Sequence, residues 1–326
     1  MKKVLLYSGG MDSWLIDKIW KPDVRLFFNI GTANNKCELD FIKRSGADVK
    51  VIDMDLSHLE IPSENFYLPL RNLYFVAMAS NYGNVIALGA TASSTHLDKT
   101  EEFCEMTSSL INYLLSEKPH LFEPVKVVIP FKDVTKTQLL KKYINEGGDI
   151  EKAYRETFSC YSPVNGEPCM NCSSCMSKFV AFYNNGYKFD REDIFKFVEF
   201  VRTHKDKCKA DVIELYNKFK TGKTIAIDFD GTITEDAPYP VTGAIRDGCF
   251  QALETMHKLG NRLILNTCRT GDDYEEAVNI CKEAGLPLEY VDIVGKVRAD
   301  YYIDNKNLGA PPINWYEIEE MFLRVL

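Results

Sequence analysis

Short apolar runs alternate with longer amphipathic segments along the first half of the chain. The runs have the length of strands and occupy residues 3–8, 24–29, 49–54, 84–89 and 126–130. Segments with helical spacing lie between them, at 12–20, 36–45, 71–82, 100–115 and 135–145. A continuous apolar run is typical of a strand that is buried on both faces. The alternation therefore predicts a parallel sheet with helices on both sides.

The same pattern begins again near residue 221. Charged amphipathic helices are expected over 191–220, and strand-like runs follow at 224–228, 262–266 and 289–294. A chain of 326 residues has the length of about two domains. We therefore predict two α/β domains, residues 1–221 and 222–326, each built on a doubly wound parallel sheet.

The charge and the apolar content of the chain argue against nucleic acid and membranes as partners. The net charge is −8 and the pI is about 5.3, so a general basic surface for nucleic acid is disfavoured. The apolar run before Ser8 has only four residues, which is too short for a signal peptide or a membrane span. We expect a cytoplasmic protein that binds no membrane, and the sequence leaves a homodimer open.

A glycine-rich loop follows the first apolar run. It consists of Ser8, Gly9, Gly10, Asp12 and Ser13, with Met11 between the second glycine and the aspartate. The glycines let the backbone approach a ligand, and the N–H groups of the next helix hold an anion. The serine hydroxyls add donors, and the carboxylate helps hold Mg²⁺ between phosphates. The loop resembles that of ATP pyrophosphatases, which implies an ATP site here; the alternative is an ordinary turn capped by serine.

Four cysteines are clustered in a C-x8-C-x2-C-x2-C pattern at Cys160, Cys169, Cys172 and Cys175. Thiolates at C-x2-C spacing both reach one tetrahedral ion, and the other two close a four-sulfur site. With no open coordination position, such a zinc ion is structural, and an iron–sulfur cluster remains an alternative with the same ligands. The six scattered cysteines read as small buried hydrophobic residues rather than disulfides.

A second constellation starts at the run 224–228, which leads into Asp228-Phe229-Asp230-Gly231-Thr232. It resembles the site of haloacid-dehalogenase (HAD) phosphatases. The resemblance implies that Asp228 is the nucleophile that forms an aspartyl-phosphate. It also implies that Asp230 first protonates the leaving group and then activates water.

Further residues of the HAD pattern follow in order. Thr267 offers a hydroxyl to the phosphoryl group, Lys296 offers a cation, and Asp300 and Asp304 would join Asp228 and Asp230 as Mg²⁺ ligands. The 36 residues between Thr232 and Arg269 are too few for a large cap domain. We expect an open, capless, Rossmannoid phosphatase; the rival interpretation is a retained scaffold without turnover.

The glycine-rich loop and the cysteine cluster together resemble the 7-cyano-7-deazaguanine synthase (QueC) family over about residues 1–185. Matching positions include Arg71 and Asn72 at a helix start, Gly89 at a strand end, and Lys136. The resemblance implies an adenine-nucleotide α-hydrolase-like fold that uses ATP to adenylate 7-carboxy-7-deazaguanine, with ammonia as acceptor of the activated carboxylate. It further implies that Lys136 stabilises phosphate charge, and that Gly89, Arg71 and Asn72 lie near nucleotide or substrate.

The segments 30–34 and 90–96 depart from the QueC pattern. ATP chemistry is retained in this interpretation, while the substrate-facing positions are altered. One alternative is a QueC-like ligase of an anti-phage defence system, which joins the deazaguanine to a protein N-terminal amine. An alternative of another class is a non-catalytic nucleotide sensor, which would release no AMP or pyrophosphate.

Overall fold

The computed structural model describes residues 1–64, 67–92, 96–164, 166–291, 297–306 and 312–324. The chain divides into two compact units, Met1–Lys188 and Phe189–Leu326. The predicted boundary was near residue 221, so the helices over 191–220, which we assigned to the first domain, group instead with the second unit. Each unit is described by itself.

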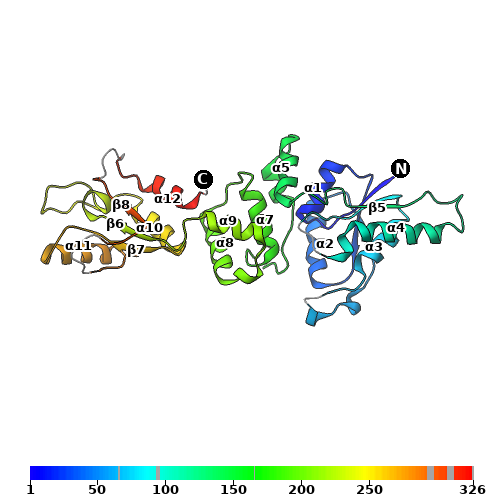
Figure 1. The fold of residues 1–326 in the computed structure, drawn as a ribbon, viewed down its shortest axis with the longest axis horizontal. Helices are drawn as coiled ribbons and strands as arrows, with labels where there is room; N and C mark the ends of the chain where they lie inside the picture. The colour runs from blue at the N-terminus through cyan, green and yellow to red at the C-terminus, as the bar shows by residue number, and fades with distance from the viewer. Residues whose placement is uncertain (65–66, 93–95, 165, 292–296, 307–311, 325–326) are drawn as a thin grey trace. The chain divides into compact units, whose positions relative to one another are not determined.

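The first unit is built on a five-stranded parallel sheet (Figure 1). Its order is β3-β2-β1-β4-β5, and in the centre Val4 of β1 pairs with Val24 of β2 and Ile86 of β4. The strands are β1 (Lys3–Leu6), β2 (Val24–Asn29), β3 (Lys50–Asp53), β4 (Val85–Ala87) and β5 (Lys126–Val128). Each was expected from its apolar run; the central strands β1 and β4 are mostly buried, while the edge strand β3 is largely exposed.

Helices cover both faces of this sheet. The larger ones are α1 (Met11–Trp20), α2 (Ala33–Ser45), α3 (Arg71–Ala79), α4 (Glu101–Leu115), α5 (Lys136–Asn145), α6 (Ile150–Arg155) and α7 (Ser173–Tyr183). Three 3₁₀ turns, η1 (Ser57–Leu59), η2 (Pro62–Glu64) and η3 (Leu97–Lys99), lie in the connections. Right-handed crossovers place α1 and α2 on one face and α3 and α4 on the other, because the chain reverses direction across the sheet after β3.

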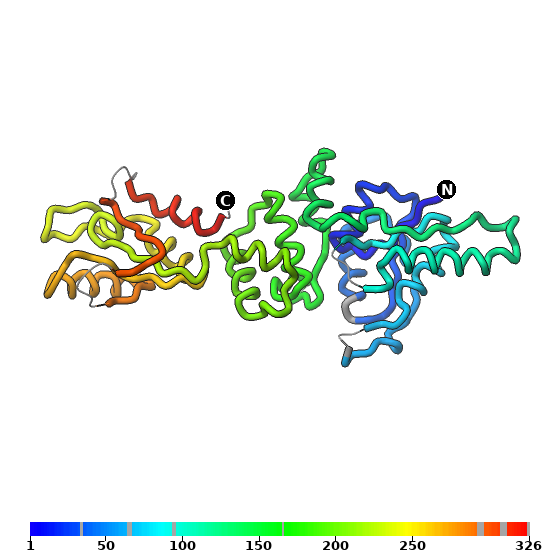
Figure 2. The backbone as a smooth tube through the Cα atoms, viewed as in Figure 1, coloured from blue at the N-terminus to red at the C-terminus, as the bar shows by residue number. Residues whose placement is uncertain are grey.

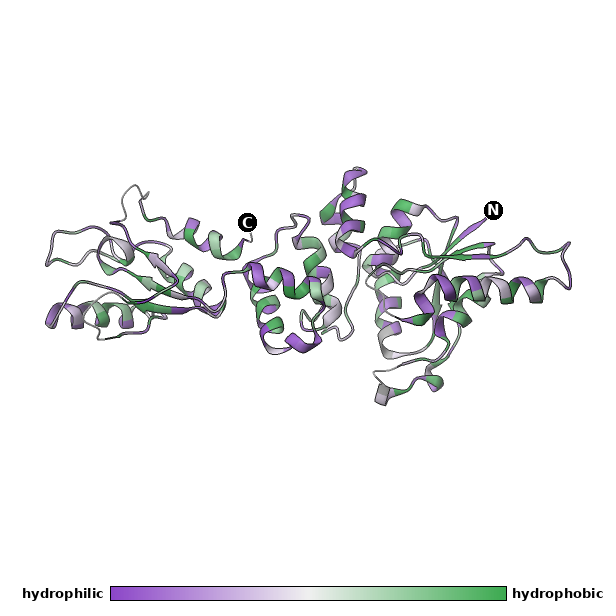
Figure 3. Ribbon diagram, viewed as in Figure 1, coloured by the Kyte–Doolittle hydropathy of each residue, from purple (hydrophilic) through white to green (hydrophobic). Residues whose placement is uncertain are grey.

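Burial agrees with this arrangement. One core cluster joins Val4, Leu26 and Ile86 of the sheet to Val76 of α3 and Ile111 of α4. Figure 3 shows green hydrophobic and purple hydrophilic residues alternating along the helices, as expected for helices that pack on one side only. Figure 2 shows the segment 116–125, between α4 and β5, extending away from the sheet.

The strand order has a switch point at the centre of the sheet, between β1 and β4. The connections from β1 and β4 leave in opposite directions, since β1 leads toward β2 and β4 leads toward β5. Ligands of open α/β sheets bind at such a switch point, outside the carboxyl ends of the strands. The loop that follows β1 contains Ser8–Ser13, so the fold puts the predicted phosphate loop at this point.

The second unit contains a three-stranded parallel sheet of order β7-β6-β8. The strands are β6 (Thr224–Ile227), β7 (Arg262–Leu265) and β8 (Tyr301–Ile303). Glu289, which belongs to no named strand, forms an isolated parallel bridge with Ile264 of β7. The helices are α8 (Arg191–Thr203), α9 (Ala210–Lys218), α10 (Cys249–Lys258), α11 (Asp272–Glu283) and α12 (Trp315–Leu323). Two shorter helical segments are η4 (Lys205–Lys207) and η5 (Phe229–Ile233).

The predicted α/β class with parallel sheets is confirmed. The expected run 289–294 falls partly outside the described residues, and β8 was not expected because two of its three residues are exposed. None of the helices in the described part of the chain combines the length and apolar composition needed to cross a membrane.

Candidate functional site

The glycine-rich loop runs directly from β1 into α1. Gly9 has a φ of 73°, and an added Cβ would lie 3.1 Å from Ile42 Cγ1, so the left-handed conformation and the close packing both require glycine. Ser8 N donates to Ser13 Oγ at 3.2 Å, and Ser13 Oγ donates to Gly10 O at 3.0 Å. Gly10 is the N-cap of α1 and carries no capping side chain. The dipole of α1 and the N–H groups of its first turn favour an anion at this end of the helix.

A second segment holds this loop from behind. Phe158 N donates to Gly9 O at 2.9 Å, and Met11 N donates to Ser159 Oγ at 3.3 Å. On the sheet side, a Cβ on Gly89 would lie 3.4 Å from Ser13 Cβ, so Gly89 lets β4 approach the start of α1 closely. The structure thus brings Gly89 and the loop together, as the sequence predicted. Ser159 was not predicted, because its contact with the loop spans 148 residues.

Asp12 and Lys136 form an ion pair at the mouth of the loop. Lys136 Nζ donates to Asp12 Oδ2 at 2.7 Å, and both side chains are about four-fifths buried, with 19% and 18% of their surfaces exposed. The capping box of Thr135 and Gln138 starts α5 at Lys136 and so fixes its position. Asp12 Oδ1 is buried and accepts no hydrogen bond from the described residues. That oxygen suits a Mg²⁺ ion that bridges phosphates.

A charged residue lies in the segment that follows the carboxyl end of each of the five strands of the first unit. After β1 to β5 in turn these residues are Asp12, Glu38, Arg71, Lys99 and Lys136. Burial lowers the pKa of Lys99, and the positive charge of Arg71 lowers it further, while Asp12 opposes the shift. Burial raises the pKa of Glu38 to about 7, and the charge of Arg71 opposes this shift. Arg71 thus interacts with both Glu38 and Lys99, and the strand order places all five residues beyond the carboxyl edge of the same sheet.

Sequence reasoning missed two of these five residues. Lys99 and Glu38 belong to no recognisable motif, and only the topology assigns them to the same edge of the sheet. Asn72, which was predicted, is buried, and its Nδ2 donates to Asp98 O at 3.2 Å. Asn72 therefore ties α3 to the η3 turn that carries Lys99, while Arg71 lies beside it at the exposed start of α3.

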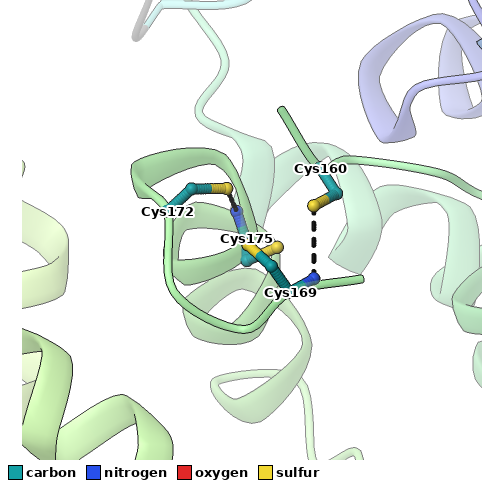
Figure 4. Close-up of side chains that lie close together, drawn as sticks. All are labelled: Cys160, Cys169, Cys172 and Cys175. Carbon is teal, nitrogen blue, oxygen red and sulfur yellow. Dashed lines mark hydrogen bonds between the residues drawn. The ribbon is translucent and has the colours of Figure 1, made fainter. Parts of the chain in front are cut away.

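The four clustered cysteines converge in the structure (Figure 4). Their Sγ atoms all lie within 4.8 Å of one another. A tetrahedral zinc ion with bonds of about 2.3 Å separates its sulfur ligands by about 3.8 Å, so the cluster has nearly the size of a zinc site. Cys172 is the N-cap of α7 and Cys175 lies in its first turn, while Cys169 N donates to Cys160 Sγ at 3.2 Å.

The protonation of the cluster points to a cation. A hydrogen bond from Cys175 lowers the pKa of Cys172 to about 5, which favours its thiolate. Burial raises the pKa of Cys169 to about 11, and the hydrogen bond with Cys172 raises that of Cys175. Four thiolates at this separation would repel one another strongly, and a bound cation removes that repulsion. The cluster therefore fits a metal ion with four sulfur ligands.

In the second unit, a tight turn follows the central strand β6. Gly231 has a φ of 73°, and an added Cβ would lie 2.0 Å from Asn305 Nδ2, so only glycine fits. Thr232 Oγ1 donates to Asp228 Oδ2 at 3.2 Å and accepts from Asn305 N at 3.0 Å. Burial raises the pKa of Asp228 to about 6, and the negative charge of Asp304 raises it further. The turn after β6 and the end of β8 thus bring Asp228, Asp230 and Asp304 close enough for their charges to interact.

Arg269 is a site residue to which the sequence analysis gave no role. Its side chain is 2% exposed, and its Nε and Nη2 donate to the two carboxylate oxygens of Asp230 at 3.0 and 2.7 Å. The guanidinium also lies 5.1 Å from the ring centroid of Phe229 and 3.6 Å from Glu276. Because a planar guanidinium matches a carboxylate in a bidentate pair, this contact fixes the orientation of Asp230.

The remaining predicted residues of the second unit have different outcomes. Thr267 follows β7, beside β6, and its Oγ1 accepts from Arg269 N at 3.2 Å, so it lies at the same edge as Asp228. Lys296 lies outside the described residues.

Asp300 was expected to bind Mg²⁺, but its Oδ2 accepts from Thr224 N at 2.8 Å at the start of β6. Strand β8 separates it from Asp304 by about 13 Å, so Asp300 does not join the carboxylates.

The fold and the first site define a class: an α/β protein with a glycine-rich loop at the centre of a parallel sheet and a cluster of four cysteines that could hold a metal ion. The family described as "Queuosine biosynthesis protein QueC" matches residues 24–186, which is half of the 326 residues. The chain belongs to this family.

Proteins called 7-cyano-7-deazaguanine synthase are similar to the chain. The protein of Persephonella marina is 27% identical over 219 residues, which cover 56% of this chain and 92% of the relative. That of Sulfurovum sp. is 28% identical over 221 residues, covering 57% and 96%. A solved structure of a conserved protein from Bacteroides thetaiotaomicron is 34% identical, covers 31% of this chain and 89% of its own, and has a TM-score of 0.28.

Proposed function

We propose that the first unit is an ATP-dependent ligase that adenylates the carboxylate of a 7-carboxy-7-deazaguanine and forms a C–N bond. The observation that carries the proposal is the Ser8–Ser13 loop at the start of α1, with the Asp12–Lys136 pair at its mouth. The similar proteins called 7-cyano-7-deazaguanine synthase support the choice of substrate. Family membership supports the same chemistry.

The residues of the first site would have distinct roles in adenylation. The loop N–H groups and the hydroxyls of Ser8 and Ser13 would bind the β- and γ-phosphates of ATP. Lys136 would neutralise charge that develops on the phosphates as pyrophosphate leaves. Asp12 would hold Mg²⁺, which supplies charge neutralisation between phosphate oxygens. Adenylation is needed because a carboxylate oxygen is a poor leaving group until AMP is attached to it.

The four-cysteine knuckle would have a structural role in this enzyme. Its four sulfur ligands leave no open position for substrate, which is typical of structural zinc. Ser159, which contacts the phosphate loop, is the neighbour of the ligand Cys160 in the sequence, and Cys175 Sγ donates to Ser159 O at 3.5 Å. Zinc would therefore stabilise the segment that holds the loop; an iron–sulfur cluster would do the same with the same ligands.

The acceptor of the activated carboxylate is either ammonia or a protein amine. Mass spectrometry after incubation with ATP, 7-carboxy-7-deazaguanine and ammonium, with and without candidate acceptor proteins, separates the two. Amide or nitrile would identify ammonia as acceptor. A mass gain on an acceptor protein, without a small product, would identify the conjugating ligase of a defence system. Absence of AMP under all conditions would contradict the ligase and support a nucleotide sensor.

We also propose that the second unit is a Mg²⁺-dependent phosphohydrolase of the HAD type. The favouring observation is the glycine turn that holds Asp228 beside Asp304, with Thr267 at the same edge. Asp228 would attack phosphorus, and Asp230 would transfer the proton to the leaving group. Mg²⁺, held by Asp228, Asp230 and Asp304, would neutralise the carboxylates and the phosphate.

A screen of phosphate compounds tests this second function. Deazapurine nucleotides, nucleic-acid ends, phosphoproteins, AMP and pyrophosphate are incubated with the full chain and Mg²⁺. We expect phosphate release from at least one class, and loss of that release in Asp228→Asn. The exposed Asp247, which accepts from Tyr316 Oη at 2.8 Å, provides a control variant, Asp247→Asn. Equal release by wild type and Asp228→Asn, or none from any compound, would contradict the proposal.

A further inference from the structure

Glu38 is a carboxylate that the proposed mechanism does not use. It lies one turn into α2, whose start is anchored to the end of β2 by Asn35. Asn35 Oδ1 accepts from Ile30 N at 2.8 Å, and its Nδ2 donates to Phe28 O at 2.9 Å. Asn35 is buried, so these two bonds fix the first turns of α2 against the sheet edge. Glu38 is therefore held beyond the carboxyl end of β2, the strand next to the one that leads into the glycine-rich loop.

The surroundings of Glu38 are those of a ligand-binding carboxylate rather than a solvated one. Its side chain is only partly exposed, and burial raises its pKa to about 7. Arg71 and Asn35 are the groups whose interactions oppose this shift. Among the described residues, no ion pair within 4 Å includes Glu38, although Asp12 at the same edge is paired with Lys136. A carboxylate in such a position stabilises the fold little unless a donor binds it.

The other carboxylates near the ends of β2 and β3 already have partners. Asp53 accepts from Asn29 Nδ2 at 2.7 Å, and Asp55 accepts from Ser57 Oγ at 2.6 Å, both at exposed positions. Asp12 is committed to Lys136 and to the phosphate loop. Glu38 has Asn35 and Arg71 as neighbours but forms no ion pair within 4 Å among the described residues, so we place it against a substrate bound beside ATP.

The chemistry of a deazaguanine matches this carboxylate. The base carries two adjacent donors, N1–H and the 2-amino group, and a carboxylate accepts both in a bidentate arrangement. We propose that Glu38 is the specificity residue of the first unit and binds this edge of the base. Arg71 would lie beside Glu38 and hold its carboxylate in position. The proposal rests on the proposed ligase function and names the group by which that site selects its base.

The test compares Glu38→Gln with wild type in the full chain. Two ligands are used: 7-carboxy-7-deazaguanine and the analogue that lacks the 2-amino group. Glutamine keeps the shape of the side chain but replaces one acceptor with a donor, which meets the base donors unfavourably. Asp40→Asn is the matched control, because Asp40 is an exposed acid on the same helix. Binding is measured by calorimetry, and kcat and KM are measured from AMP release.

Wild type should prefer the 2-amino ligand by about 10-fold to 100-fold, the worth of one hydrogen bond to a charged group. Glu38→Gln should remove this preference, mainly through KM, while Asp40→Asn leaves it unchanged. If Glu38→Gln does not fold, Glu38→Asp replaces it: the shorter carboxylate should bind both ligands more weakly and keep the preference. A preference retained in Glu38→Gln, or lost in Glu38→Asp, would overturn the inference. Failure of wild type to bind either ligand would instead overturn the ligase function.

Discussion

At the scale of single residues, the Asp12–Lys136 pair is central, because it joins two helix starts that are 124 residues apart. Both partners are mostly buried, so removing the lysine leaves a buried carboxylate beside the phosphates without its counter-charge. Lys136→Ala should reduce kcat/KM for AMP formation by about 100-fold to 1,000-fold, the cost of losing one charge-stabilising group. The measurement is the initial rate of AMP release at varied ATP.

Lys142→Ala is the control for this variant, since Lys142 lies on the same helix and pairs at 2.8 Å with the exposed Glu146. It should form AMP at the wild-type rate, because exposed pairs of this kind contribute little. If Lys136→Ala also kept the wild-type rate, Lys136 would have no part in charge stabilisation.

The raised pKa of Asp228 leads to a prediction about how the free energy of unfolding depends on pH. Its pKa is about 6 in the folded chain, above the ordinary value of 3.8, so the folded state binds a proton more tightly than the unfolded state does. Stability therefore falls as pH rises from about 4 to 6, and the full penalty remains above pH 6. Asp228→Asn removes this penalty and should raise the free energy of unfolding by about 1–3 kcal/mol at pH 7.5, with a smaller gain at pH 4.5.

Thermal unfolding of wild type and Asp228→Asn at the two pH values, without divalent cations, measures this effect. A variant that was less stable than wild type at pH 7.5 would show that burial does not strain the carboxylate. Addition of Mg²⁺ should narrow the difference, because the cation would stabilise the wild-type carboxylates that asparagine lacks.

Residues with a local motif were predictable from the sequence, and residues without one were not. Ser8 to Ser13 follow a strand directly, and the structure places them at the start of α1 as expected. Lys99, Glu38 and Arg269 are single charged residues whose neighbours come from distant elements, so their position depends on the fold. The prediction that Asp300 binds Mg²⁺ was wrong for a related reason: the sequence did not show that a strand separates it from Asp304.

At the scale of elements, the cysteine knuckle and the phosphate loop form one mechanical unit. The segment Phe158–Cys160 bonds the loop at Gly9 and Met11 and then enters the knuckle. Loss of the metal should loosen this segment, because four unpaired thiols no longer hold it against α7. We expect removal of zinc by a chelator, or Cys169→Ser, to weaken ATP binding by about 10-fold or more, the effect of lost support around a site.

ATP affinity and zinc content measured on the same samples test this coupling. Cys208→Ser is the control, since Cys208 is a partly exposed cysteine outside the cluster. Unchanged ATP affinity in zinc-free protein that remains folded would show that the knuckle does not support the loop.

The strands and helices of the first unit were largely predictable, because each buried strand is a continuous apolar run bounded by polar residues. The short elements were harder. Strand β8 has three residues, two of them exposed, and so shows neither the apolar run nor the alternation of a buried strand. Helix α7 begins inside the cysteine pattern, where the ligand spacing hides the helical period.

At the scale of the whole molecule, the chain contains two units, each with its own parallel sheet and its own candidate site. The predicted boundary lay near 221, where the second sheet begins, because helices α8 and α9 carry no signal that assigns them to either side. The two compact units are Met1–Lys188 and Phe189–Leu326, so α8 and α9 group with the second unit.

The central claim is that the first unit activates a carboxylate by joining it to AMP. The most direct test uses 7-carboxy-7-deazaguanine labelled with ¹⁸O in its carboxylate, together with ATP and the acceptor, in unlabelled water. When the amine displaces AMP from the acyl-adenylate, one carboxylate oxygen leaves with the phosphate. Mass spectrometry of AMP should therefore find one ¹⁸O atom in each molecule formed. AMP without the label, released at the same rate, would contradict carboxylate adenylation.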